Sequence, residues 1–329
     1  MKPRILFVAW YPYGVSWVRR DLDILKEYYA VEVVQCIRLA DALKIFIKMM
    51  KVDISFVWFA GKAAAATVFF SKLLGKKSIV VAAGADAARV PEIEYGTALN
   101  PINRFFVQFS FQYADVVLAV SESTRIELLK NYHVNPEKVR VVYHGFEYEK
   151  YKPEGEKENL VLTVGGVSWG NMARKGLETF VKAANYLNDV KFMLVGAHED
   201  ECISYLKSIA GSNVKFTGFI PFPDLLGFMQ KARVYVQVSA HEGFGCSLAE
   251  AMLCEEVPVI TKRGAIPEVV GNTGIYVPYG NPRKTALAIK EALLSPKGKE
   301  ARNRIVKKFP LSKREEALHE IIKNLLDEC

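Results

Sequence analysis

The chain has 329 residues, of which 50% are hydrophobic and 24% are charged, which is enough for two buried cores at roughly 100–200 residues per domain. It has no run of about 18 uncharged apolar residues, which argues against a membrane-spanning helix. Its five scattered cysteines form no C-x-x-C pair, which argues against disulfides and structural zinc and favours a reducing cytoplasm.

The positive charge is concentrated in the first part of the chain. The whole chain has 44 Lys and Arg against 36 Asp and Glu, a net charge of +8, and residues 1–152 account for +6 of it with 21 against 15. Such an excess suits anionic partners such as phosphates or acidic lipid headgroups. No Lys/Arg-rich block or aromatic-basic motif of an RNA binder occurs, so we expect no nucleic-acid partner.

Short apolar runs alternate with helix-length segments along the first part of the chain. Continuous Val and Ile runs between helices predict a parallel sheet covered on both faces. The predicted strands are 5–9, 31–35, 54–59, 78–83, 115–120 and 139–143, and helical segments between them include 15–29, 63–74, 98–113 and 122–131.

The charged stretch 148–159 predicts a linker, and a second series of the same kind follows it. Pro310 then precedes a helical stripe that we expect to cross back to the first domain. The fold class is therefore α/β, with two doubly wound Rossmann-like domains that face each other across a cleft. The first domain is predicted at 1–152 and the second at 153–309, and the C-terminal helix follows at 310–329. The strands of the second series are predicted at 160–166, 191–196, 214–218, 234–239, 257–261 and 274–278, and its helices at 176–187, 200–210, 222–231, 247–254 and 283–294.

The stretch 241–250, HEGFGCSLAE, places two carboxylates around a glycine-rich turn between a predicted strand and a predicted helix. Glu242 follows the carboxyl end of the strand, where parallel sheets bind ligands. The two glycines permit close approach of a ligand to the backbone. Ser247 and Glu250 also fit a capping box, which needs no ligand. HEGFG is not H-E-x-x-H, so we expect no zinc.

Residues 164–176, VGGVSWGNMARKG, follow the first strand of the second series. They match neither G-x-G-x-x-G nor the P-loop, which argues against dinucleotide oxidoreductases and P-loop NTPases. We expect Arg174 and Lys175 near a helix N-terminus, where their charge opposes the helix dipole. That placement favours a bound anion between the cations and the helix. The alternative is that the two cations are solvated charges of a loop and bind no anion.

Two loops of the first domain carry weaker candidates. Asp86, in AAGAD after strand 78–83, is expected either to accept hydrogen bonds from a hydroxylated substrate or to cap the following turn. Gly14, after the first strand, would let a ligand approach the backbone. Loops of α/β proteins routinely carry Gly and Asp, so neither residue decides a function.

Two segments of the first domain suggest surfaces or core. Residues 37–51 combine apolar positions with four cations, a pattern found in helices that lie on anionic membranes, although most such helices cover a sheet. The aromatic stretch 104–113 is interpreted as core packing.

Taken together, these residues resemble the group 1 glycosyltransferases of family 4, which have the GT-B fold. The resemblance covers nearly the whole chain and is strongest in residues 160–295. Its most specific element is EGFGCSLAE, the E-x7-E motif of that family, which AMLCEEVPVI, GAIPEVV and GIYVP follow in the family's order.

The resemblance implies a role for each candidate residue. Glu242 would hold hydroxyls of the donor sugar, Glu250 the nucleotide ribose and Lys175 the donor diphosphate, while Asp86 matches the acidic residue of its loop. The implied catalytic set is Glu242, Lys175 and Asp86, with no metal ligand. Further contacts to the donor are implied for Gly243, Phe244, Gly245, Cys246, Ser247, Arg174, Gly166, Gly14, Phe219 and Ile220.

The chain departs from the family pattern at two positions. Gly166 stands where the family commonly has Arg, a charge that Arg174 would have to supply. The loop AAGAD lacks the His that relatives often carry, which puts the histidine contact to the donor sugar in doubt.

The resemblance implies transfer of a sugar from a UDP- or GDP-sugar to a hydroxyl acceptor, with retention of anomeric configuration and without a metal or other cofactor. We expect the protein in the cytoplasm, with peripheral contact to an anionic membrane at its inner face. The residues do not specify the donor sugar, the acceptor (lipid-linked, glycan or small molecule) or the oligomeric state. Two alternatives stay open: a nucleotide-sugar epimerase, against which the His-poor loops weigh, and a non-catalytic nucleotide-sugar-binding protein.

Overall fold

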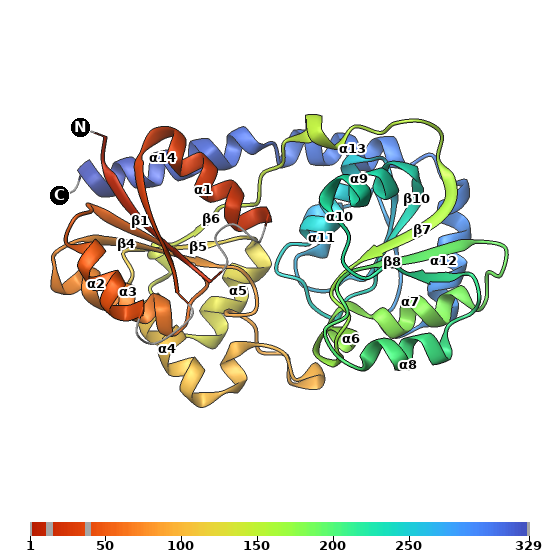
Figure 1. Ribbon diagram of the computed structural model, residues 1–329, viewed down its shortest axis with the longest axis horizontal. Helices are drawn as coiled ribbons and strands as arrows, with labels where there is room; N and C mark the ends of the chain where they lie inside the picture. The colour runs from red at the N-terminus through yellow and green to blue at the C-terminus, as the bar shows by residue number, and fades with distance from the viewer. Residues whose placement is uncertain (1, 11–15, 37–40, 328–329) are drawn as a thin grey trace. The chain divides into compact units, whose positions relative to one another are not determined.

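The computed structural model describes residues 2–10, 16–36 and 41–327 (Figure 1). The chain divides into two compact units, unit 1 (Met1–His144 with Ser312–Cys329) and unit 2 (Gly145–Leu311). Each unit contains a six-stranded parallel sheet flanked by helices. The predicted α/β fold with two doubly wound sheets is therefore confirmed.

Unit 1 has the strand order β2-β1-β3-β4-β5-β6, and every pairing is parallel. The order reverses between β1 and β3, the usual ligand position in such sheets. Its strands are β1 (Arg4–Ala9), β2 (Ala30–Gln35), β3 (Ile54–Trp58), β4 (Lys77–Ala82), β5 (Val116–Ala119) and β6 (Val139–Val141). Its α-helices are α1 (Ser16–Tyr28), α2 (Asp41–Met49), α3 (Lys62–Leu73), α4 (Pro101–Tyr113), α5 (Glu122–Asn131) and α14 (Leu311–Asp327).

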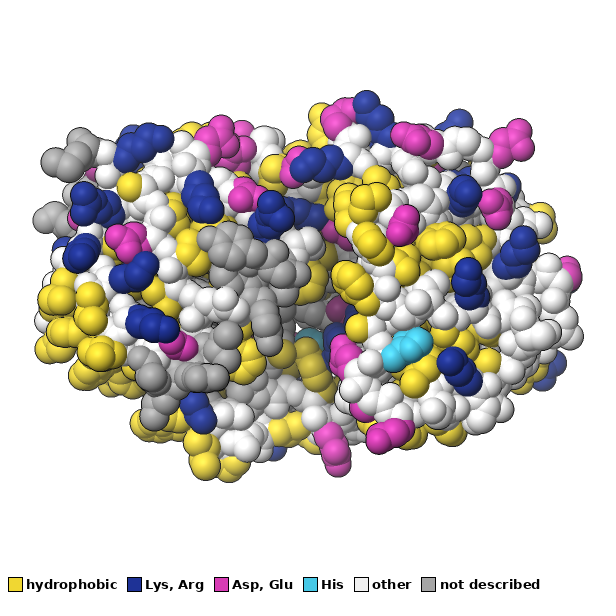
Figure 2. All heavy atoms as spheres, in the orientation of Figure 1, with side chains coloured by type: hydrophobic (Ala, Val, Ile, Leu, Met, Phe, Trp, Pro, Cys, Tyr) yellow, Lys and Arg dark blue, Asp and Glu magenta, His cyan; other side chains and the backbone are white. Residues whose placement is uncertain are grey.

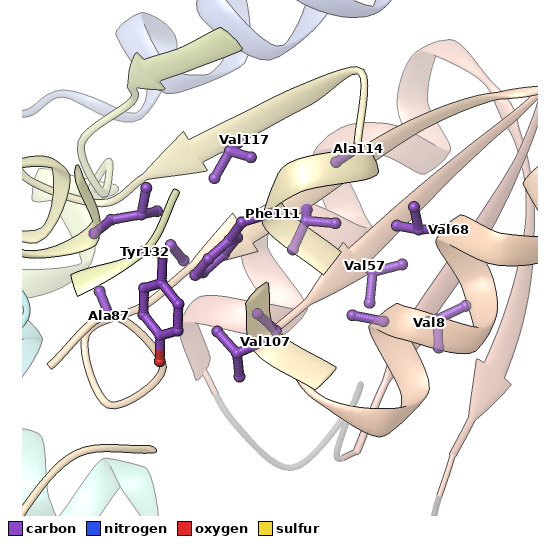
Figure 3. Close-up of a cluster of buried hydrophobic side chains, with 14 of the residues drawn as sticks. Val8, Val57, Val68, Ala87, Val107, Phe111, Ala114, Val117 and Tyr132 are labelled. Atoms are coloured by element: carbon purple, nitrogen blue, oxygen red, sulfur yellow. The ribbon is translucent and has the colours of Figure 1, made fainter. Parts of the chain in front are cut away.

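The core of unit 1 lies between the sheet and the helices that cover it. Val8, Val57 and Val117 come from three strands and pack against Val68 of α3 and Phe111 of α4 (Figure 3). The continuous apolar strands are buried because helices cover the sheet, as their composition predicts.

The prediction that the aromatic stretch 104–113 packs into the core is only half right. Val107 and Phe111 are fully buried, but Phe105 is 66% exposed and Tyr113 is also exposed. The stretch forms α4, and a helix on a sheet buries one stripe while the other faces solvent.

The C-terminal helix α14 is bound to unit 1 by a buried ion pair. Arg314 Nη2 and Nε donate to the two oxygens of Asp21 on α1, at 2.7 and 2.5 Å. Its Nη1 also donates to the carbonyl oxygens of Val142 and Tyr143, at 2.8 and 2.9 Å. Every oxygen in this set is satisfied by one guanidinium, which fixes the helix against the end of β6.

Unit 2 has the strand order β12-β11-β10-β7-β8-β9, again all parallel. Its strands are β7 (Glu158–Val164), β8 (Lys191–Val195), β9 (Val214–Phe216), β10 (Ala232–Gln237), β11 (Val257–Ile260) and β12 (Ile275–Tyr276). Its α-helices are α6 (Trp169–Lys175), α7 (Leu177–Ala184), α8 (Cys202–Ile209), α9 (Phe222–Lys231), α10 (Cys246–Leu253), α11 (Ile266–Val270), α12 (Pro282–Leu294) and α13 (Gly298–Lys308).

Three helices of unit 2, α6, α11 and α13, were not predicted. The first two have seven and five residues, too short for an apolar period to be recognised. The predicted linker 148–159 is also partly wrong, because it begins with a 3₁₀ helix (Tyr148–Tyr151) whose Tyr151 is buried. The strand β7 already begins at Glu158.

Glu256, directly before β11, is a fully buried carboxyl group. Among the described residues, neither of its side-chain oxygens has a hydrogen-bond partner. Burial raises the pKa of Glu256 well above its ordinary value of 4.5, and the nearby charge of Lys157 opposes this only in part. The folded chain therefore keeps a proton that the unfolded chain releases as the pH rises above that ordinary value, and stability falls in that range.

We expect Glu256→Gln to stabilise the protein increasingly as the pH rises. Gln cannot ionise, so its free energy of unfolding should exceed that of the parent more at about pH 8 than at about pH 5. Thermal unfolding at both pH values measures this, and a difference of about 1 kcal/mol corresponds to about 2–4 °C in Tm. The half-buried neighbour provides the control Glu255→Gln. A Tm advantage that is independent of pH would contradict the prediction.

Candidate functional site

The candidate site lies where the strand order of unit 2 reverses, between β7 and β10. These strands are parallel neighbours, with Val161 opposite Val234 and Leu162 opposite Tyr235. Their carboxyl ends bring the loop after Val164 beside the loop after Gln237. Ligands of doubly wound sheets bind at this position, and both sequence motifs of the second domain lie there.

Glu242 is buried in the loop after β10 and is surrounded by donors. Its Oε1 lies 3.1 Å from Lys175 Nζ, 3.6 Å from Arg174 Nη1 and 3.2 Å from Ser239 Oγ. Its backbone carbonyl accepts the N–H of Ala265, 2.9 Å away. The structure thus brings together Glu242, Lys175 and Arg174, which the sequence analysis placed in separate motifs.

The protonation state of Glu242 follows from these neighbours. Burial alone would raise its pKa, but Lys175 and then Arg174 outweigh that effect and hold the pKa below the ordinary carboxyl value. The carboxylate therefore stays ionised at neutral pH and acts only as a hydrogen-bond acceptor. With two cations and one anion, the cluster keeps a net positive charge.

The two cations lie in the last turn of α6, where the dipole of that helix favours positive charge. They also directly precede Gly176, the N-cap of α7, so the prediction that they lie near a helix N-terminus is confirmed. Gly176, in the left-handed conformation with φ +67°, ends α6, and a Cβ at that position would lie 2.2 Å from the carbonyl oxygen of Val238. The Ala240 N–H donates to the Arg174 carbonyl, 2.8 Å away, so the loop after β10 holds the end of α6 directly.

The glycines after β7 leave room for two side chains. A Cβ on Gly165 would lie 2.5 Å from Lys175 Cδ, and one on Gly166 would lie 2.2 Å from Glu199 Oε1. Glu199 thus occupies space beside the position where the resemblance expects an arginine. Arg174 donates from Nη2 and Nε to Asn171 Oδ1, at 2.7 and 3.2 Å. No sequence pattern links position 199 to position 166.

The predicted capping box is wrong. The helix α10 begins at Cys246, its N-cap is Gly245, and no side chain caps it, so Ser247 lies inside the helix. Glu250 is buried one turn further along α10, and its Oε1 accepts the hydroxyl of Tyr151 at 3.0 Å. Tyr151 falls in the predicted linker, and no local sequence pattern indicates this contact.

The residues around the turn divide into anchors and accessible positions. The ring of Phe244 is buried and packs against Phe146 and Phe309, with ring centroids 6.0 and 5.2 Å apart. Its side chain therefore fixes the loop, and only its backbone is suited to a ligand. The accessible positions, all partly exposed, are Gly243, Gly245, Cys246 and Ser247.

The loops after β8 and β9 extend the same edge of the sheet. The Gly196 N–H donates to the Gly218 carbonyl, 3.1 Å away, and the Gly165 N–H donates to the Val195 carbonyl, 2.8 Å away. Phe219 follows Gly218 and is 79% exposed, and the next residue is Ile220. An exposed aromatic ring on this edge offers a flat apolar surface.

The candidates of the first domain belong to unit 1. Asp86 is 2% exposed, and its oxygens accept the backbone N–H groups of Ala60, Ala83 and Gly84 at 2.9–3.0 Å. Burial raises its pKa while these donors lower it. Of the two roles open to Asp86, the structure shows the capping of the loop after β4. Gly14 lies outside the described residues.

Two further observations concern metals and membranes. Within the described ranges, no group of three or more His, Cys, Asp or Glu side chains is arranged to hold a metal ion. None of the described helices has the length and apolar character needed to cross a membrane.

Sequence profiles of known families match both parts of the chain. The profile of "Glycosyltransferase Family 4" matches residues 34–150, and that of "Glycosyl transferases group 1" matches residues 158–295. The chain belongs to the group 1 glycosyltransferases. The family match includes the whole of the ion cluster and α10.

Relatives and solved structures agree with this family. The O-antigen chain mannosyltransferase RfbU of Salmonella typhimurium is 28% identical over 57% of this chain and 53% of its own length. The uncharacterized glycosyltransferase MJ1069 of Methanocaldococcus jannaschii is 27% identical over 73% and 66%. The chain thus spans between half and two thirds of the length of these relatives.

Two solved structures resemble the chain over nearly its whole length. Anabaena Alr3699/HepE in complex with UDP and glucose has a TM-score of 0.79 at 20% identity, covering 98% of this chain and 100% of that chain. Sucrose-phosphate synthase from Thermosynechococcus elongatus has a TM-score of 0.81 at 16% identity, covering 100% of both. At these identities the likeness shows the fold, and it is the predicted GT-B fold.

We expect Gly165→Ala to displace Lys175 without unfolding the protein. The three atoms nearest to the new methyl group all belong to the flexible Lys175 side chain, so the ammonium group should leave Glu242 and nucleoside diphosphate binding should weaken. Calorimetric titration of UDP and GDP measures the loss. In a Lys175→Ala background, Gly165→Ala should cause no further loss of affinity, because the effects of two residues in contact are not additive. Gly170→Ala is the control, since no atom lies within 4 Å of its Cβ. Additive losses in the double variant would refute this contact.

Proposed function

We propose that the protein transfers a sugar from a UDP- or GDP-sugar to a hydroxyl group of an acceptor. The observation that carries this proposal is the buried cluster of Glu242, Lys175 and Arg174 at the strand reversal of unit 2. It combines an ionised hydrogen-bond acceptor, four residues before the start of α10, with two cations, within a family of glycosyltransferases.

The cluster suits a ligand with hydroxyl groups and a diphosphate. A diphosphate would attract Lys175 and Arg174, which have a net excess of positive charge over Glu242. As the ammonium group turns to the phosphate oxygens, the Glu242 carboxylate is left to accept hydroxyl groups of the sugar. The backbone N–H groups at the start of α10 add donors for the phosphate. Glu250 would hold the ribose through its carboxylate, which the hydroxyl of Tyr151 helps to orient.

The same groups would stabilise departure of the nucleoside diphosphate. Negative charge grows on the leaving phosphate while the sugar becomes oxocarbenium-like, and preorganised cations and N–H donors at that position lower the barrier. We further propose that transfer retains the anomeric configuration and needs no metal or other cofactor, with the leaving phosphate accepting the proton of the acceptor hydroxyl. Asp86 would act indirectly, by holding the loop after β4.

We place the reaction in the cytoplasm, with a lipid-linked, glycan or small-molecule acceptor and with peripheral contact to an anionic membrane. Phe219 offers its exposed face to the nucleotide base, beside the backbone of Ile220. Gly166, Gly243 and Cys246 are partly exposed and would contact the donor through their backbone.

The experiment that tests this function measures release of UDP or GDP from a panel of nucleotide sugars, with and without acceptors. We expect acceptor-dependent release that falls by about 10²–10³ in Lys175→Ala, the usual loss for one preorganised donor. The matched control is Lys182→Ala, since Lys182 forms a surface pair with Glu178 at 2.6 Å. Binding without release across the panel would favour the non-catalytic alternative, and isomerisation of the sugar would favour the epimerase.

We expect Glu242→Gln to separate nucleotide binding from transfer. The variant releases Lys175 and Arg174 from their counter-ion, so affinity for UDP or GDP should be unchanged or higher. Sugar transfer should fall by roughly 10² or more, because the amide no longer offers a charged acceptor. Calorimetry and the release assay measure the two effects, with Glu178→Gln as the control. Loss of nucleotide binding would show that Glu242 mainly holds the loop together.

A further inference from the structure

The helix α2 exposes an apolar stripe on the surface of unit 1. Leu43 and Ile47 are four residues apart and lie on one side of the helix, and Met50 follows the helix directly, three residues after Ile47. The opposite side buries Ile45 and Met49 against the core. Both sides of α2 therefore carry apolar residues, one side packed on the core and the other exposed to solvent.

The neighbouring helix α3 continues this surface. Phe69 and Leu73 are four residues apart and exposed, while Ala64 and Val68 are buried. The two helices are in contact, with the rings of Phe46 and Phe70 5.1 Å apart between them. Leu43, Ile47, Met50, Phe69 and Leu73, each 45–64% exposed, form what we call the α2–α3 face. Figure 2 shows hydrophobic side chains gathered where Figure 1 places these helices, with Lys and Arg side chains beside them.

The apolar residues of this face are accompanied by many lysines. Residues 41–51 and 62–77 contain seven lysines and one acidic residue, Asp41, which pairs with Lys44 at 2.8 Å. Glu32 and Asp115, from outside these segments, pair with Lys48 and Lys72 at 3.0 and 2.6 Å. With Asp53, which lines one pocket with Lys51 and Lys76, lysines outnumber carboxylates by seven to four, so these segments have a net positive charge.

A basic pocket of about 660 Å³ adjoins the same helices. It lies at the amino-terminal ends of β1, β3 and β4, where Lys51 follows Met50 and Lys76 follows the end of α3. The carboxylate there, Asp53, accepts the Arg4 backbone N–H at 2.8 Å. The charged side chains that line the pocket are Lys2, Arg4, Lys51, Lys76 and Asp53.

We propose that the α2–α3 face docks unit 1 on an anionic lipid bilayer. Exposed Leu, Ile, Met and Phe side chains would enter the interface between headgroups and acyl chains, and the lysines would pair with lipid phosphates. The basic pocket has the charge and size for one phosphorylated headgroup. A second copy of this chain fits less well, because two such faces would oppose their seven lysines to one another.

This surface extends the membrane contact suggested by residues 37–51 of the sequence. The helix α2 carries two exposed apolar residues and Met50 follows it, whereas the tertiary structure adds α3 and the pocket. The proposal does not depend on the transfer reaction, because lipid binding is measured without donor or acceptor. Failure of vesicle binding would therefore remove the membrane contact and leave the transfer reaction standing, and failure of transfer would leave the membrane contact standing.

The test is flotation of the full chain with vesicles at low salt. We expect binding to vesicles of phosphatidylcholine mixed with phosphatidylglycerol, weak binding to phosphatidylcholine alone, and release by high salt. Lys51→Glu/Lys76→Glu should weaken binding at least about tenfold, since each lysine near an anionic surface contributes about one kcal/mol. Phe69→Ser/Leu73→Ser should separately weaken binding by at least about the same factor, since binding scales with the apolar area that enters the interface.

Matched controls come from α12, which exposes residues of the same types. Leu287→Ser/Leu294→Ser and Lys284→Glu/Lys290→Glu alter exposed positions of unit 2 and should leave vesicle binding unchanged. Circular dichroism and Tm identify any variant that fails to fold, and the second pair of variants then decides the result. Absence of binding by the parent, or equal losses in the α12 controls, would overturn the proposal. So would sedimentation showing that Phe69→Ser/Leu73→Ser abolishes a dimer while vesicle binding persists.

Discussion

A carboxylate removed from water stays ionised only where cations and hydrogen-bond donors replace the solvent, and the candidate site depends on this constraint at Glu242. Lys175 and Arg174 meet it from the last turn of one short helix. That turn is in turn held by Gly176 and by the Ala240 N–H. The ion cluster thus connects the end of α6 to the loop after β10, and its two cations exceed its one anion in charge.

Glu242 and Asp86 show how environment divides the work of two buried carboxylates. Each follows the carboxyl end of a central strand in its own unit. Asp86 is surrounded by backbone N–H groups, and burial raises its pKa, so it organises a loop. Glu242 faces the cationic side chains of Lys175 and Arg174, which hold its pKa below the ordinary value. Only the second arrangement leaves partners that a ligand can exchange.

Particular residues show how far the sequence predicts the structure. All twelve strands were predicted close to their observed bounds, because apolar runs alternating with helices report burial on both faces of a sheet. Phe105 was assigned to the core and is exposed, because composition alone does not tell which stripe of a helix faces the sheet. The capping box at Ser247 failed because the helix begins one residue earlier, at Cys246, with glycine at its N-cap.

The sequence by itself determined the class of fold and the family, and it singled out Glu242, Lys175 and Glu250 as candidate site residues. These follow from local periodicity and from one specific motif. Only the tertiary structure decided the partners of each charge. Lys175 and Glu242 are 67 residues apart, Tyr151 and Glu250 are 99 apart, and Arg314 and Asp21 are 293 apart. Such pairs depend on which strands are neighbours in the sheet, and local hydrophobic patterns in the sequence do not specify the strand order.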